Sequence, residues 1–269
     1  MVRNIIRQAA EELSKSDSPM LDAGVLLAFV MKKQSAALIF DMPDENELKL
    51  FREYIEKRKQ GVPVAYILGE KEFMGLPFKL NSDTLIPRPD TECLVEKIIE
   101  ENTFSSPKIL DLCTGSGCIG ISLAYFIKNS TVSLTDISEG ALSKATENAE
   151  LNGVSERTSV SKLDVLNDEI GVGYDIIVSN PPYIRTDVMK TLKVSEYEPH
   201  RALDGGDDGL IFYRVIAKKA GAALKKGGIL AFEIGYDQGE DVKALLGNFS
   251  EVKLYKDYGD NDRVVIAVK

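Results

Sequence analysis

The chain has 269 residues, of which 44% are hydrophobic, and a formal net charge of −9 at pH 7. This length and apolar content allow one large or two modest domains with substantial cores, and the acidity disfavours a large basic nucleic-acid surface. No run of about 18 apolar residues indicates a membrane span, and three cysteines with one histidine lack metal-site spacing, so we expect a cytoplasmic protein without a bound metal.

The first 60 residues have the apolar spacing of amphipathic helices. Breaks fall at residues 16–19 and 42–44, where Asp44 is suited to cap the third helix. The three apolar stripes comprise Ile6, Ala9, Ala10 and Leu13, then Leu21, Val25, Leu26, Phe29 and Val30, then Leu48, Phe51 and Ile55. We predict a small helical bundle domain over residues 1–68.

A connector rich in Gly and Pro occupies residues 69–90, and its short apolar run at 76–80 predicts a β-hairpin. Near its end, Pro87 and Pro89 fix the backbone on either side of Arg88, which favours a functional position for this arginine. The alternative is a linker that the prolines only stiffen. In that alternative, a helix capped at Asp90 or Thr91 follows the linker.

From residue 108 onward, strand and helix patterns alternate. Helices are predicted at 117–127 and 138–151, and strands at 108–112, 131–135, 159–163, 175–179, 228–233, 252–255 and 264–268. Such alternation predicts a doubly wound α/β domain over residues 91–269, whose ligands bind at the carboxyl ends of the strands.

A glycine-rich loop links the first strand of this domain to its first helix. Gly115, Gly117 and Gly120 spell G-x-G-x-x-G, and Asp136, at the end of the second strand, is spaced to bind a ribose hydroxyl. The glycines alone fit NAD and S-adenosylmethionine equally well. Asp111 beside the loop favours S-adenosylmethionine, because a carboxylate repels a pyrophosphate but attracts an ammonium or sulfonium group.

Other polar residues near predicted strand ends have less specific interpretations. Asp164 ends the third strand, where it could accept the adenine amino group with Val165 against the ring, or could simply cap the strand. His200 is the only histidine, and we expect a structural hydrogen bond from it. The acidic run 204–209 predicts a flexible turn, and its negative charge disfavours phosphate binding.

The strand at 175–179 ends in Asn180-Pro181-Pro182-Tyr183. Prolines lack an N–H and hold the preceding residue extended, so the turn is rich in acceptors and directs the Asn180 side chain away from the strand. The Asn180 side-chain oxygen and the Pro181 carbonyl could receive both hydrogens of a planar NH2 group, with Tyr183 offering an aromatic face. The alternative is an ordinary proline-terminated loop.

Together these motifs resemble the HemK/PrmC family of protein-(glutamine-N5) methyltransferases. The resemblance rests on Asn180 to Ile184, residues 87–92, Asp111 to Gly120, Glu198-Pro199 with 204–206, and 233–235. It implies a class I, Rossmann-like methyltransferase fold with a seven-stranded, mostly parallel sheet. It also implies a cofactor site formed by Asp111, Cys113, Thr114, Gly115, Ser116, Gly117, Asp136, Ile137, Asp164, Val165 and Asn180.

The resemblance further implies the substrate and the reaction. The methyl group of S-adenosylmethionine would pass to the Gly-Gly-Gln glutamine of class 1 peptide chain release factors, leaving S-adenosylhomocysteine. Arg88, Pro89, Asn180, Pro181, Pro182 and Tyr183 would bind this substrate, and the last four would be catalytic. Residues 1–68 would help to hold the protein partner. We expect a monomer that requires neither nucleic acid nor a membrane.

Three other functions are considered. A ribosomal-protein glutamine methyltransferase would share nearly every motif and differ mainly in the N-terminal domain. A DNA adenine-N6 methyltransferase would share Pro-Pro-Tyr but needs phosphate contacts that a chain of net charge −9 supplies poorly. An NAD-binding module would explain the glycines but not Asn180 to Tyr183.

Overall fold

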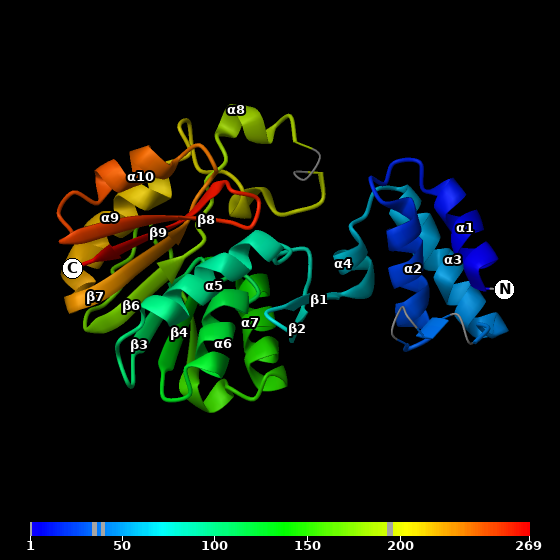
Figure 1. Ribbon diagram of the computed structural model, residues 1–269, viewed down its shortest axis with the longest axis horizontal. Coiled ribbons are helices and arrows are strands. Elements are labelled where there is room, and N and C mark those ends of the chain that lie inside the picture. Colours follow the sequence, from blue (N-terminus) through cyan, green and yellow to red (C-terminus); the bar gives the residue numbers. More distant parts are fainter. Residues whose placement is uncertain (1, 34–36, 39–40, 193–195) are drawn as a thin grey trace. The chain divides into compact units, whose positions relative to one another are not determined.

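The computed structural model describes residues 2–33, 37–38, 41–192 and 196–269. The chain divides into two compact units, Met1–Glu70 and Lys71–Lys269 (Figure 1). Within the described ranges, no helix is both long enough and apolar enough to cross a membrane.

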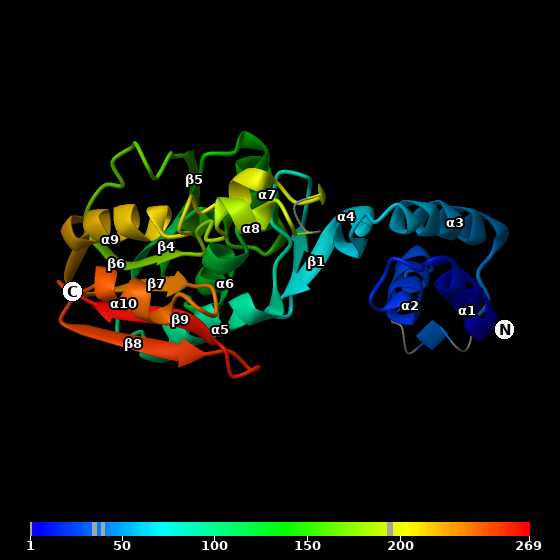
Figure 2. The same ribbon diagram turned by 90° about the horizontal axis from the view of Figure 1, so that it is seen from above.

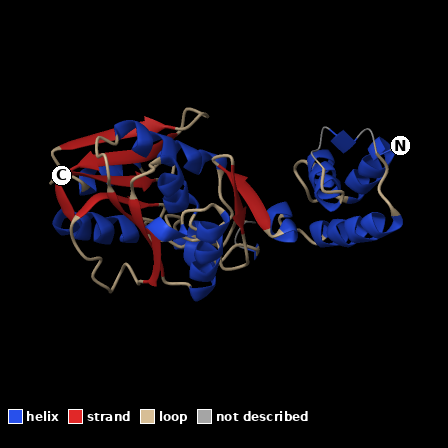
Figure 3. Ribbon diagram, turned by 90° about the horizontal axis from the view of Figure 1, so that it is seen from below, coloured by secondary structure: helices blue, strands red, loops and turns tan. Residues whose placement is uncertain are grey.

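The smaller unit consists of helices and their connections (Figure 3). Its helices are α1 (Val2–Glu12), α2 (Pro19–Val30), α3 (Glu45–Lys59) and α4 (Val64–Leu68). Asp44 caps α3 as predicted: its carboxylate accepts from the Glu47 amide at 2.8 Å, while the Glu47 side chain accepts from the Asp44 amide. The predicted stripe of α2 is confirmed at Leu26 and Val30, which are buried, and is wrong at Leu21, which is 65% exposed, because Ala23 and Leu27 face the core instead.

A two-stranded hairpin, β1 (Glu70–Phe73) and β2 (Leu76–Lys79), starts at the division between the units, and all of it after Glu70 belongs to the larger unit. Helix α5 (Pro89–Glu101) follows, with Arg88 as its N-cap. The predicted cap at Asp90 or Thr91 is therefore wrong. Pro89 is well suited to the first helical position because that residue needs no N–H and its φ is already helical.

A seven-stranded sheet forms the centre of the larger unit, in the order β5-β4-β3-β6-β7-β9-β8. Only β9 runs antiparallel to its neighbours, so the predicted mostly parallel sheet is confirmed. The strand order reverses between β3 and β6, which is where such sheets bind ligands. The strands are β3 (Lys108–Leu112), β4 (Thr131–Asp136), β5 (Thr158–Lys162), β6 (Tyr174–Ser179), β7 (Leu224–Glu233), β8 (Glu251–Lys256) and β9 (Asp262–Val268).

Helices cover both faces of this sheet (Figure 2). One core joins alternate strand residues to α5, α6 (Cys118–Phe126) and α7 (Glu139–Leu151). The opposite core joins the intervening residues to α9 (Ile211–Ala223) and α10 (Gly239–Leu245). Every residue of β6 is buried, as expected for a central strand covered on both faces. Short helical turns at α8 (Thr186–Met189), Ser155–Arg157 and His200–Ala202 complete the unit.

Candidate active site

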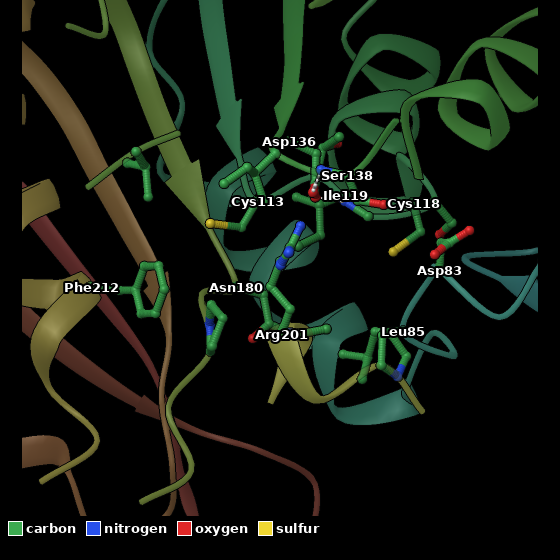
Figure 4. A pocket seen from close by; sticks show the side chains of 18 of the residues that line it. Asp83, Leu85, Cys113, Cys118, Ile119, Asp136, Ser138, Asn180, Arg201 and Phe212 are labelled. Carbon is green, nitrogen blue, oxygen red and sulfur yellow. Dashed lines mark hydrogen bonds between the residues drawn. The ribbon is translucent and has the colours of Figure 1, made fainter. Parts of the chain in front are cut away.

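A pocket of about 570 Å³ opens at the carboxyl ends of the central strands (Figure 4). It brings together most of the residues that the sequence predicts for the cofactor and substrate sites. Those that line it are Arg88, Cys113, Thr114, Gly115, Ser116, Asp136, Ile137, Asp164, Val165, Asn180 and Pro182. Five nominated residues, Pro89, Asp111, Gly117, Pro181 and Tyr183, lie outside the lining.

Asp111 lies beneath the glycine loop and is fully buried. Its Oδ2 accepts hydrogen bonds from the Thr114 hydroxyl at 2.6 Å and the Gly120 amide at 2.9 Å. Burial raises its pKa to about 7, against the lowering effect of these two donors. Asp111 thus lies outside the pocket lining and holds the loop against α6, and its predicted place in the cofactor site stays a prediction.

Two residues of the glycine loop have unusual backbone requirements, Gly120 and Cys113. Gly120 packs so closely on β3 and β4 that a Cβ there would collide with the Leu134 side chain and lie 2.8 Å from Asp111 Oδ2. Cys113 occupies a left-handed backbone conformation, with φ of 59°. Such a conformation favours glycine, so Cys113 carries backbone strain at the pocket wall. Burial raises the pKa of its thiol, which is consistent with an unreactive packing role.

Asp136 supplies a second carboxylate at the glycine loop, and this one lines the pocket. Its Oδ2 accepts from the Gly115 amide and its Oδ1 from the Ser138 amide, both at 2.9 Å. Burial raises the Asp136 pKa, while the backbone amides and the Arg201 charge act in the opposite direction. Figure 4 shows the Arg201 side chain reaching into the pocket on this side. Sequence reasoning missed Arg201 because no local pattern connects it to the loop.

Asp164 lies on the next wall, after β5. Its carboxylate accepts from the Leu166 amide at 3.0 Å and the Asn167 side chain at 2.8 Å, and the Asn167 contact contributes most to its lowered pKa. Val165 and Leu166 add apolar surface to the lining. This part of the pocket thus combines the Asp164 carboxylate, a hydrogen-bond acceptor, with the apolar surface of Val165 and Leu166. Such a lining suits a planar heterocycle that carries an amino group.

The Asn180 loop forms a third wall. Asn180 and Pro182 line the pocket, whereas Pro181 is buried and Tyr183 is half-buried behind them. Burial raises the Tyr183 pKa to about 12, so its hydroxyl stays neutral at physiological pH.

The glycine-rich run at 204–209 packs behind this loop. The Gly205 amide donates to Ile184 O at 2.8 Å, and a Cβ at Gly209 would collide with the Tyr183 carbonyl oxygen. Gln238 bonds both segments, donating to Tyr183 O at 3.1 Å and Gly209 O at 3.3 Å. The predicted flexible turn is therefore a tightly packed support for the Asn180 loop.

Arg88 and Glu198 connect two further segments of the pocket rim. Glu198 is buried, forms an ion pair with Arg88 and accepts the Ile86 amide at 3.2 Å. The residues that follow Glu198, from Pro199 to Ala202, line the pocket, so His200 lies at the site. Within the described ranges, no cluster of three or more His, Cys, Asp or Glu side chains could hold a metal ion.

Comparisons with known proteins identify both units. The family model "Methyltransferase small domain" matches residues 89–197, and "PrmC N-terminal domain" matches residues 4–69. A release factor glutamine methyltransferase of Clostridium acetobutylicum is 42% identical over 260 residues, which cover 93% of this chain and 91% of the relative. A protein of the same name from Moorella thermoacetica is 37% identical, and the match covers 100% and 98% of the two chains. The chain is thus a methyltransferase that belongs to the release factor glutamine methyltransferase family.

Proposed function

We propose that this protein transfers a methyl group from S-adenosylmethionine to the side-chain amide nitrogen of the glutamine in the Gly-Gly-Gln motif of a class 1 release factor. The observation that carries the proposal is that Asn180 lines the same pocket as the glycine loop, Asp136 and Asp164. The names of the relatives support the release factor as partner. Translation termination takes place in the cytoplasm, where the protein would act.

The donor set of the pocket fits S-adenosylmethionine. Asp136 suits the ribose hydroxyls, Asp164 suits the adenine amino group, and Val165 and Leu166 suit the ring faces. The cofactor supplies, when bound, a methyl group on a positively charged sulfur. Carboxylates near the pocket favour such a cation.

A dinucleotide fits the same loop poorly. A pyrophosphate needs free amides at the glycine loop, but the Gly115 amide already donates to Asp136 Oδ2. A phosphate there would have to displace this carboxylate or lie beside its charge. Asp136, which lines the pocket and holds the Gly115 amide, is therefore the carboxylate that disfavours NAD at this loop.

Asn180 and Pro181 would act on the acceptor nitrogen. An amide nitrogen is a weak nucleophile because its lone pair is delocalised into the carbonyl group. The Asn180 side-chain oxygen and the Pro181 carbonyl would accept its two hydrogens, hold it in line with the methyl group and stabilise the positive charge that develops there. The nitrogen would form its bond to the methyl carbon as the bond from that carbon to sulfur breaks, and it would lose one of its two protons to solvent. The support behind Tyr183 from Gly209 and Gln238 would keep these two oxygens in place.

We further propose that the N-terminal unit helps to bind the protein substrate. Its core, centred on Leu13, Leu26, Leu27 and Phe51, is separate from the two cores of the larger unit, so the larger unit should fold without it. Deleting residues 1–69 should leave cofactor affinity unchanged and reduce methylation of an intact release factor. Normal methylation by the truncated protein would refute this role.

The function is tested by incubating the purified protein with S-adenosylmethionine and a class 1 release factor. Mass spectrometry should locate one methyl group on the Gly-Gly-Gln glutamine. Parallel reactions with ribosomal proteins and with adenine-containing DNA test the other acceptors. Modification of either, with an untouched release factor, would overturn the proposal. Calorimetry with S-adenosylhomocysteine and NAD tests the cofactor: tight NAD binding without a response to S-adenosylhomocysteine would overturn that part.

A further inference from the structure

Glu233 is a buried acid beside the catalytic loop that the motifs left without a role. It is 2% exposed and ends β7, the strand next to β6. In their parallel register, Ser179 pairs with Phe232, so Asn180 and Glu233 are the next residues on adjacent strands. Asn180 lies two residues after Val178, and Glu233 lies two residues after Ala231. The side chains of Val178 and Ala231 both belong to the core that includes α5. Since strand side chains alternate, Glu233 points to the face that α5 covers.

The surroundings of Glu233 connect it to the pocket. Thr91, in the first turn of α5, lines the pocket and is itself buried. Burial is the largest influence on the Glu233 pKa and raises it to about 7, while the nearby Thr91 and Asn180 side chains lower it. The Oε2 atom is buried and has no hydrogen-bond partner among the described residues. A buried acid with an unsatisfied oxygen is costly, so its position beside Asn180 calls for a functional explanation.

An ionised carboxylate can only accept hydrogen bonds. The end of the Asn180 amide that faces Glu233 is then its NH2 group, which leaves the oxygen directed elsewhere. A protonated Glu233 could instead donate to the Asn180 oxygen and remove the acceptor from the slot. We propose that Glu233 is a positioning residue for methyl transfer: its carboxylate holds the Asn180 NH2 group and thereby turns the Asn180 oxygen toward the acceptor nitrogen. This inference rests on the proposed function.

The orientation of the Asn180 side chain should depend on pH, because only the ionised form of Glu233 holds the Asn180 NH2 group. The groups that face Glu233 are Asp90 from α5, Arg263 from β9, Tyr183, Tyr213 from α9 and Cys118 from α6. Tyr183 and Cys118 have pKa values raised to about 12, and burial raises that of Tyr213 as well. These three stay neutral, and Arg263 stays positively charged. Activity should therefore rise with pH through about 7.

The first test observes the contact without catalysis. The Asn180 NH2 signals in a ¹⁵N–¹H spectrum are identified by their absence in Asn180→Ala. They should shift with pH with a midpoint near 7, and this shift should vanish in Glu233→Gln. Signals that titrate equally in Glu233→Gln, or do not titrate in the wild type, would overturn the inference whatever the enzyme methylates.

The second test measures kcat/KM for a Gly-Gly-Gln protein from pH 5.5 to 9. Glu233→Gln should lose the acid limb yet retain most activity at pH 8.5, since the glutamine oxygen can still accept from Asn180. Glu233→Ala should lower kcat by about 10- to 100-fold, as expected for a lost charged hydrogen bond, without changing the cofactor dissociation constant. Wild-type kcat in folded Glu233→Ala, or an acid limb that persists in Glu233→Gln, would overturn the inference.

Neighbouring variants keep the test informative if Glu233→Ala does not fold. Asp90→Asn removes a charge that raises the Glu233 pKa, so the acid limb, which is the rise of kcat/KM with pH through about 7, should move to lower pH. Thr91→Val removes a hydroxyl that lowers the Glu233 pKa, so the acid limb should move to higher pH. Glu240→Gln is the matched control, because Glu240 is 82% exposed on α10, and its limb should stay in place. An acid limb at the wild-type pH in both Asp90→Asn and Thr91→Val would contradict the inference. If the Asn180 signals of the wild type titrate but the protein methylates no release factor, only the proposed function is refuted.

Discussion

Replacing Asn180 by alanine should separate the chemistry of this site from its fold. The change removes one of the two oxygens proposed to bind the acceptor NH2 group. Loss of one oriented contact to charge that develops in the transition state typically lowers kcat by about 10²- to 10³-fold, or roughly 3–4 kcal/mol. Cofactor affinity should change much less, because Asp136, Asp164 and the glycine loop stay intact.

The structure adds a stability effect that depends on pH. Asn180 lowers the pKa of Glu233, so its removal raises that pKa further in the folded protein. The folded-state pKa of Glu233, about 7, already exceeds its ordinary value of 4.5, so the stability associated with its protonation is lost as pH rises from about 4.5 through about 7. Asn180→Ala should therefore cost about 1 kcal/mol at pH 8.5 and little at pH 5.

The assay is single-turnover methyl transfer to a release factor, with thermal melts at both pH values. Asn180→Asp is the control, because a carboxylate keeps an acceptor at this position. Its charge lies beside Glu233, and two adjacent carboxylates favour sharing a proton. This variant should retain more activity than alanine, with its optimum at lower pH than the wild type. A folded Asn180→Ala protein with normal turnover would show that the Asn-Pro-Pro-Tyr loop only terminates β6.

Three further substitutions test the pocket walls. Asp136→Ala should weaken binding of S-adenosylhomocysteine by roughly 1.5–3 kcal/mol in calorimetry, and an unchanged dissociation constant would assign the ribose to another acid. Asp111→Asn removes a carboxyl whose folded pKa, about 7, lies far above its ordinary value of 3.8. Wild type loses stability as pH rises from about 4 to 7, so the free energy of unfolding of the variant should improve relative to wild type over this range, by up to about 4 kcal/mol. A constant difference in melts would contradict the buried position. Cys113→Gly relieves a left-handed residue and should raise stability by about 1 kcal/mol, whereas a lower melting temperature would mean that thiol packing outweighs the strain.

Local sequence patterns determined much of this protein. Strand-like apolar runs alternate with helices from residue 108 onward, which was sufficient to predict the sheet and the edge where ligands bind. Asp44 capped its helix because capping depends on a side chain and an amide three residues apart. The glycine loop and the Asn-Pro-Pro-Tyr turn were recognisable for the same reason, since each acts through the backbone of a few consecutive residues.

The tertiary structure decided which of these residues face the pocket and what supports them. Asp111 adjoins the glycine loop in sequence, but the close packing of Gly120 on β3 and β4 buries it beneath the loop. Glu198 meets Arg88, 110 positions away. Glu233 lies next to Asn180 across the sheet only because β6 and β7 are neighbours. No local signal encodes such contacts, because strand order and register depend on how both faces of the whole sheet are covered.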